Sequence, residues 1–277
     1  MLQDLRGIFQ SNIKSLEILY LLEGVKPVAR IMAREDERNK VLGFFGEKGL
    51  SYAVSDFKVV KQDRDKSYSD KGIKVPIDSK EKGYFFVYVS RDKAKAEKAK
   101  ELENENKHKE LGVLLGYPEC CAEFFEKNFS EESEKQNDFT LASLKNSEGF
   151  QFPSYTNIAS RHFDLALLNH FPCSFNCEKS VELAKKHLEV IEKDDKEAAG
   201  IIKGMLKGAV LYTNEGVFLL RDYKLDNNRL YYKGVMGSIN NQLSESLKNA
   251  EHIEILKKDR IILDSLELKN IGVMLFS

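Results

Sequence analysis

The N-terminal third of the chain changes from a helical to a strand-like pattern of apolar positions. Between residues 2 and 23 the apolar side chains recur every three or four positions, which predicts one amphipathic helix that ends at Gly24. The charged segment 61–82 is predicted to be a solvated loop with one short strand at 73–77. β-branched and aromatic runs separated by turn-rich gaps predict a small antiparallel sheet, with strands at 28–32, 41–45, 50–60 and 84–89.

The middle of the chain has mainly helical patterns. Segment 93–109 consists mostly of Lys, Glu, Ala and Asn, which favours an exposed helix or tether with too little apolar surface to be buried. We interpret it as the start of a new domain. Further helices are predicted at 118–129, 139–144, 158–169 and 177–192.

The C-terminal part returns to short apolar runs between turns. A helix is expected at 238–250, and strands are expected at 209–212, 216–220, 230–235, 253–256, 260–263 and 273–276. The sequence therefore predicts an α+β protein in three parts. These are an N-terminal helix and antiparallel sheet (1–92), a central helical domain that carries the cysteines (93–205), and a C-terminal β-rich region (206–277).

The composition limits the classes of partner. Among 277 residues, 43 Lys and Arg nearly balance 44 Asp and Glu, so no strong field favours nucleic acid or an anionic membrane. No apolar run approaches the ~20 residues needed to cross a bilayer. The first residues lack the basic and apolar regions of a secretion signal, so we expect a cytoplasmic protein. No phosphate-binding glycine loop, dinucleotide fingerprint or Ser-His-Asp order is present.

All four cysteines lie in two short motifs. The first is Gly-Tyr-Pro-Glu-Cys-Cys at 116–121, and the second is His-Phe-Pro-Cys-Ser-Phe-Asn-Cys at 170–177. In each motif an aromatic-Pro step follows an apolar run ending in Leu-Leu and precedes a helical pattern. Because the chain uses the same arrangement twice, we predict that the two motifs meet and bind one metal centre.

Each motif is predicted to start a helix. Proline is favoured at the first helical position, which Pro118 and Pro172 would occupy. The cysteines that follow would lie near the positive end of the helix dipole, which favours the thiolate form that binds metals. Cys177 follows Cys173 by four residues, so the two would share one helical face.

The candidate metal ligands are Cys120, Cys121, Cys173, Cys177 and His170. Structural zinc sites usually combine two knuckles in which two to four residues separate the cysteines, and only the second motif has such a spacing. Adjacent cysteines suit a polynuclear cluster, so an iron-sulfur cluster such as [4Fe-4S] and zinc both stay open. His170 is a candidate to replace one cysteine or to cap the site. A further alternative leaves one cysteine as a nucleophile or an open coordination position.

Two alternatives need no metal. Cysteine is among the most buried residue types, so the four residues are also compatible with plain core packing. Disulfides between the motifs are a second alternative, which the reducing cytosol disfavours except in heat-adapted organisms.

Four further residues are candidates to support the site. Tyr117 is expected to pack under the first cysteine turn or to act as an acid. His162 lies on the predicted helix that leads to the second motif. Asn176 and Ser180 are positioned to hydrogen-bond sulfur or to serve as ordinary helix-start residues.

The two motifs together carry a resemblance. Leu-Gly-Tyr-Pro-x-Cys-Cys at 115–121, followed by His-x-Pro-Cys-x-x-x-Cys-x-x-Ser at 170–180, resembles a largely archaeal prokaryotic family known as domain of unknown function 483. The resemblance covers about residues 109–193 and implies an archaeal cytosolic setting without an established activity. An anaerobic setting would favour an iron-sulfur cluster, and a heat-adapted one would favour disulfides.

Three functions follow from these observations. The leading hypothesis is a metalloprotein with a four-cysteine centre, an iron-sulfur cluster or zinc, which serves redox or small-molecule chemistry. The second is a non-catalytic interaction module that structural zinc stabilises and that binds a protein partner. The third is a metal-free thiol redox protein. The sequence identifies no particular small molecule or protein partner.

Overall fold

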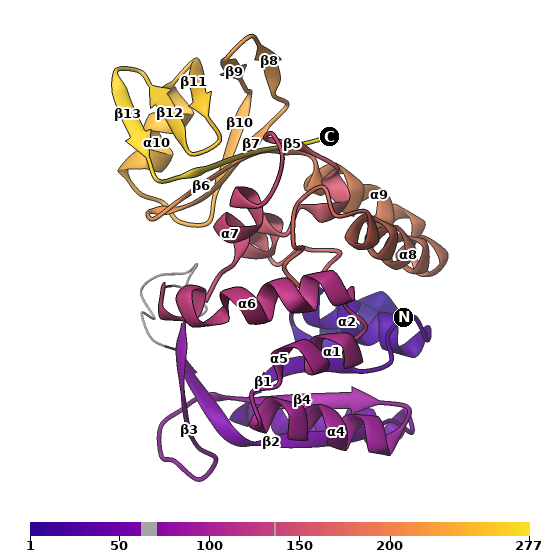
Figure 1. Ribbon diagram of the computed structural model, residues 1–277. Helices are drawn as coiled ribbons and strands as arrows, with labels where there is room; N and C mark the ends of the chain where they lie inside the picture. Colours follow the sequence, from indigo (N-terminus) through magenta and orange to yellow (C-terminus); the bar gives the residue numbers. More distant parts are fainter. Residues whose placement is uncertain (62–70, 136) are drawn as a thin grey trace. The chain divides into compact units, whose positions relative to one another are not determined.

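The structure, a computed structural model, describes residues 1–61, 71–135 and 137–277 and confirms the α+β class (Figure 1). The part of the predicted 61–82 loop from 62 to 70 lies outside the described residues. The helices are α1 (Leu2–Phe9), α2 (Asn12–Leu22), α3 (Arg38–Glu47), α4 (Lys93–Asn104), α5 (His108–Leu114), α6 (Glu119–Lys135), α7 (Thr140–Lys145), α8 (Glu178–Asp194), α9 (Lys196–Leu206) and α10 (Gln242–Asn249). Short 3-10 helices are η1 (Glu35–Glu37), η2 (Ser154–Thr156) and η3 (Ala159–Phe163).

The strands are β1 (Ala29–Arg34), β2 (Ser51–Lys61), β3 (Gly72–Pro76), β4 (Tyr84–Ser90), β5 (Gln151–Phe152), β6 (Gly208–Thr213), β7 (Gly216–Arg221), β8 (Lys224–Asp226), β9 (Arg229–Tyr231), β10 (Gly234–Gly237), β11 (His252–Lys257), β12 (Arg260–Leu263), β13 (Leu266–Lys269) and β14 (Gly272–Phe276). The chain divides into two compact units. The first consists of the described residues up to Asp138 together with Lys185–Lys196, and the second consists of Phe139–Ala184 and Glu197–Ser277.

The first unit contains the predicted antiparallel sheet, in the order β1-β4-β2-β3. Helix α4 lies along this sheet (Figure 1), and its Ala96, Ala99 and Leu102 are buried against Ala53 and Tyr88. Of the two predicted alternatives, a helix or a tether, the helix forms, but the prediction that it has too little apolar surface to be buried is wrong. Alanines spaced three residues apart provide a narrow apolar face that lets the helix approach the sheet closely.

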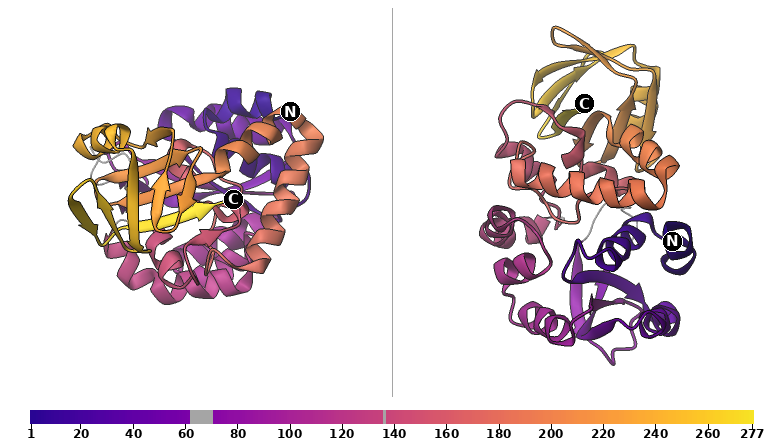
Figure 2. Two further views of the ribbon diagram at one scale, coloured as in Figure 1. Left: turned by 90° about the horizontal axis from the view of Figure 1, so that it is seen from above. Right: turned by 90° about the vertical axis from the view of Figure 1, so that its right-hand side faces the viewer.

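The second unit contains two sheets (Figure 2). Their strand orders are β10-β7-β6-β14-β5 and β13-β12-β11-β9-β8. Both sheets contribute to one apolar core, in which Phe218 and Val273 from the first sheet meet Leu230 and Ile261 from the second. The short strands β5, β8 and β13 were not predicted. Two to four residues are too few for an alternating pattern to stand out in a sequence.

Two N-terminal predictions are corrected. The predicted single helix over residues 2–23 is two helices, because Gln10 adopts a left-handed conformation with φ of 50° and Ser11 caps α2. Residues 41–45 form part of α3 rather than a strand. The buried residues of α3 are Val41, Phe44 and Phe45, whose spacing of three and four is helical.

The predicted helix over residues 158–169 is also corrected. Only the 3-10 helix η3 forms there, and Asp164 ends it with φ of 54°. The apolar residues from Leu165 to Leu168 are all buried without being helical. A consecutive apolar run can be buried from all sides, so it does not need helical periodicity.

Candidate metal centre

The first cysteine motif turns the chain sharply between α5 and α6. Gly116 has φ of +84°, a conformation that glycine adopts without strain. The amide of the next residue, Tyr117, donates to the carbonyl of Gly112 at 3.0 Å and closes the end of α5. The Pro118 carbonyl then accepts from the amide of Cys121 at 2.9 Å. Helix α6 thus begins directly after Pro118, and the predicted placement of both cysteines in its first turn is confirmed.

The start of α6 is fixed by close contact with α5. A Cβ atom built on Gly112 would lie 2.9 Å from the Cβ of Ala122, which is closer than carbon atoms normally pack. Glycine at position 112 therefore lets the two helices approach each other. Ala122 directly follows Cys121, so this contact sets the position of the cysteine turn.

The second cysteine motif is a loop, which corrects the prediction of a helix started by Pro172. Helix α8 begins at Glu178, so Cys173 and Cys177 do not share a helical face. The Cys177 carbonyl accepts from the amide of Val181 at 3.0 Å, which places Cys177 at the cap position of α8. Its own amide donates to the Ser174 carbonyl at 3.0 Å and tightens the loop.

Polar side chains that were not predicted as functional hold this loop. Ser143 Oγ donates to the Pro172 carbonyl at 2.7 Å, and Asn146 Nδ2 donates to the Cys173 carbonyl at 2.7 Å. Ser147 Oγ accepts from the amide of Phe175 at 2.8 Å. Thr156 Oγ1 donates to the Phe175 carbonyl at 2.9 Å. In the sequence, Ser143, Asn146 and Ser147 form a polar stretch near the end of a short helix. Such a stretch is too common to identify a site.

The Phe175 side chain anchors the middle of the same loop. It is 0% exposed, and its ring centroid lies 5.1 Å from that of Phe152 and 5.5 Å from that of Phe276. Buried aromatic contacts of this kind hold a loop in one conformation. The loop that carries Cys173 and Cys177 is therefore fixed by both hydrogen bonds and packing.

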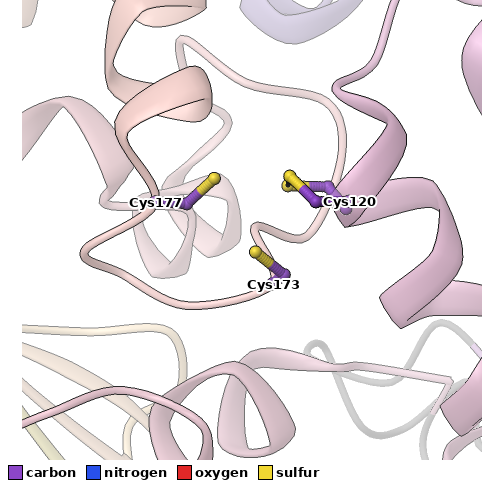
Figure 3. Close-up of side chains that lie close together, drawn as sticks. Cys120, Cys173 and Cys177 are labelled. Atoms are coloured by element: carbon purple, nitrogen blue, oxygen red, sulfur yellow. Dashed lines mark hydrogen bonds between the residues drawn. The ribbon is translucent and has the colours of Figure 1, made fainter.

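The four cysteine side chains lie close together, as the sequence predicted. All four sulfur atoms lie within 4.8 Å of one another. Figure 3 shows the sulfur atoms of Cys120, Cys173 and Cys177 pointing toward a common point. Cys121 and Cys177 are buried, whereas Cys120 and Cys173 are partly exposed. None of the four is joined to another by a disulfide bond in the structure.

The sulfur distances fit a metal ion. In a tetrahedral site with Zn–S bonds of about 2.3 Å, the sulfur atoms are about 3.8 Å apart. The sulfurs of the adjacent residues Cys120 and Cys121 are 3.9 Å apart, well beyond the length of a disulfide bond. Four sulfurs within 4.8 Å could therefore hold a metal ion. The adjacent pair does not require a polynuclear cluster.

His170, the first residue of the second motif, forms a hydrogen bond with Ser180, three residues after the motif. Both are buried, and His170 Nε2 lies 3.0 Å from Ser180 Oγ. The group of mutually close ligand atoms consists of the four cysteines and does not include His170. Asn176 is exposed. The hydrogen bond of His170 with Ser180 brings the two ends of the cysteine loop together.

Two further candidates, Tyr117 and His162, pack against a lysine and a tyrosine, respectively. Lys26 Nζ lies 4.7 Å from the centre of the Tyr117 ring, and burial raises the pKa of the Tyr117 hydroxyl. Lys26 itself forms a buried ion pair with Glu17 at 2.7 Å. The His162 ring packs edge-on against Tyr212, with 5.9 Å between the centroids. Tyr117 thus packs against the Lys26 side of a buried charge pair.

The segment that contains the site matches a known family model. Residues 96–206, which contain both motifs, match the family described as Protein of unknown function (DUF483). This segment is therefore similar to that family, in agreement with the resemblance seen in the motifs. Searches of curated proteins and of solved structures found no match. Among the described residues, every helix is too short or too polar to cross a lipid bilayer.

Proposed function

We propose that the protein is a cytoplasmic zinc protein in which Cys120, Cys121, Cys173 and Cys177 bind one zinc ion as thiolates. The observation that carries this proposal is the mutual approach of the four sulfurs to within 4.8 Å. Four thiolates are a common ligand set of structural zinc sites. The helix starts at which Cys120, Cys121 and Cys177 lie favour the thiolate form.

The same distances favour a single ion over a four-iron cluster. In a [4Fe-4S] centre the thiolates bind different iron atoms, so their sulfurs stand farther apart than the ligands of one ion. Sulfurs within 4.8 Å of one another are near the distance expected around one tetrahedral ion. A single iron ion would have the same geometry, and the metal analysis below distinguishes it from zinc.

Four thiolates complete a tetrahedral coordination shell and support a structural role. Catalytic zinc sites usually keep one position open for water or substrate, whereas structural sites are closed. The fold holds the start of α6 and the loop before α8, two segments distant in the sequence, so that their cysteine sulfurs converge. We propose that the stabilised fold serves to bind a partner, a protein or a small molecule.

Metal analysis of the purified protein tests the proposal. Protein prepared without oxygen should be colourless and contain one zinc per chain, and chelation should lower its unfolding temperature. Changing any one of the four cysteines to serine should lower the zinc content. Ser174→Ala, in the same loop, is the matched control and should keep the metal.

The alternatives give different results. A brown protein with four irons and sulfide would indicate a cluster, and one iron without sulfide would indicate a single iron ion. Protein that contains neither metal and has an unfolding temperature insensitive to chelators would overturn the proposal. In that case the partial exposure of Cys120 and Cys173 favours a thiol redox protein, whose thiols should titrate reversibly.

A further inference from the structure

Lys258 caps the end of α7, the helix that holds the second cysteine loop. Its ammonium nitrogen donates to the carbonyls of Leu144 at 2.9 Å, Lys145 at 3.2 Å and Ser147 at 2.8 Å. The last carbonyls of a helix have no partner within the helix and carry the negative end of its dipole. One cation that binds the carbonyls of Leu144 and Lys145 in α7, and that of Ser147 just beyond it, fixes both the position and the direction of the last turn.

Lys258 is itself held in place. It lies half-buried in the turn between β11 and β12, and its carbonyl accepts from the amide of Val273 at 2.8 Å. Next to Val273, a Cβ atom on Gly272 would lie 2.7 Å from Leu141 of α7. Helix α7 therefore rests directly on β14, and Lys258 extends from the β11–β12 turn, which its carbonyl joins to β14, to cap the helix.

The last turn of α7 connects this cap to the cysteine loop. Ser143 and Asn146 donate to two consecutive carbonyls of the loop, those of Pro172 and Cys173. Ser147 uses its carbonyl to bind Lys258 and its hydroxyl to bind the amide of Phe175. A shift of this turn would move the loop backbone on both sides of Cys173.

We propose that Lys258 is a positioning residue of the metal centre, which acts through α7 to hold Cys173 and Cys177 in the geometry that binds metal. The inference rests on the proposed zinc function and adds a residue 81 positions beyond Cys177 in the sequence to the site. Lys258 touches no ligand sulfur in this arrangement. Lys258 removes alternative positions of the loop, so the ligands are already ordered before the metal binds. An ordered ligand set loses less conformational entropy on binding, which strengthens the affinity.

Zinc affinity of three variants tests the role. Lys258→Met keeps the length of the side chain and removes the charge and the three hydrogen bonds, and Lys258→Arg restores both charge and donors. Lys257→Met changes the exposed neighbouring lysine and is the matched control. We expect Lys258→Met to bind zinc about tenfold more weakly, as for other residues that orient metal ligands, whereas Lys258→Arg and Lys257→Met stay close to wild type.

The cobalt spectrum provides a readout that a general loss of stability would not change. Cobalt bound by four thiolates absorbs through sulfur-to-cobalt charge transfer, with an intensity that reflects the number of bound thiolates. At saturating cobalt, Lys258→Met should show a weaker charge-transfer band than wild type. Equal zinc affinity and an equal spectrum in Lys258→Met would overturn the inference.

A second variant keeps the test decisive if Lys258→Met does not fold. Asn146 is exposed, and Asn146→Ala removes only its hydrogen bond to the Cys173 carbonyl. It should lower zinc affinity in the same direction, and unchanged affinity would count against the path through α7. Failure of the wild-type protein to bind zinc or cobalt would instead overturn the proposed function, so the two failures are distinguishable.

Discussion

The contact between α5 and α6 predicts opposite effects for two glycine-to-alanine substitutions. In Gly112→Ala the new methyl group would lie 2.9 Å from the Cβ of Ala122. Carbon atoms pack at about 3.5–4.0 Å, so the helices must separate by about 1 Å. Such overpacking costs about 1–3 kcal/mol. The higher helix propensity of alanine offsets about 1 kcal/mol of this cost. The free energy of unfolding should therefore fall by about 1 kcal/mol in total.

Gly43→Ala is the matched control. Gly43 lies within α3, and a Cβ atom there would meet no atom within 4 Å. The substitution therefore brings the gain in helix propensity without a clash and should raise the free energy of unfolding by about 1 kcal/mol. The two variants should differ by about 2 kcal/mol in urea unfolding of the zinc-loaded protein.

The same pair of variants separates stability from metal binding. A shift of α6 moves its first turn, which carries Cys120 and Cys121, and metal–ligand distances tolerate only about 0.2 Å. Competition with a chromophoric chelator should show weaker zinc binding by Gly112→Ala and wild-type binding by Gly43→Ala. If both variants were equally stable and bound zinc equally well, the close helix contact would not set the cysteine geometry.

Two further predictions concern buried charges in the first unit. Glu17→Gln leaves the Lys26 ammonium buried without its ionic partner, so urea unfolding should show a loss of about 3–5 kcal/mol, and an unchanged midpoint would contradict the importance of the pair. Burial disfavours the charged form of Glu103, but Arg30 outweighs it and keeps the pKa of this carboxyl below its usual value of 4.5. Ionised Glu103 therefore stabilises the fold above that pH, and this stability is lost as the pH falls through the lowered pKa. The urea midpoint should fall with acidification in this range, and Arg30→Leu should remove this part of the pH dependence.

Local sequence patterns predicted the structure correctly where interactions between neighbouring residues determine it. The helix start at Pro118 and the first-turn position of Cys120 and Cys121 depend on residues a few positions apart. Most strands with an apolar run of four or more residues were predicted for the same reason. Residues 41–45 were misassigned because a short apolar run fits both a strand and a helix, and only the spacing of its buried members distinguishes them.

The second motif shows where local patterns fail. Proline at position 172 was expected to start a helix, yet its carbonyl binds Ser143 and the chain stays in a loop until Glu178. Partners far away in the sequence stabilise this loop, and their hydrogen bonds outweigh a helix propensity that amounts to fractions of a kcal/mol per residue.

The sequence by itself determined the α+β class, the two cysteine motifs and the expectation that they converge, because residue type and spacing carry that information. The tertiary structure decided how close the sulfurs come, that Cys173 and Cys177 lie on a loop, and that Ser143, Asn146 and Lys258 support it. These features arise from contacts between residues up to 114 positions apart. Such contacts form only when the whole chain folds, so no local pattern of residues encodes them.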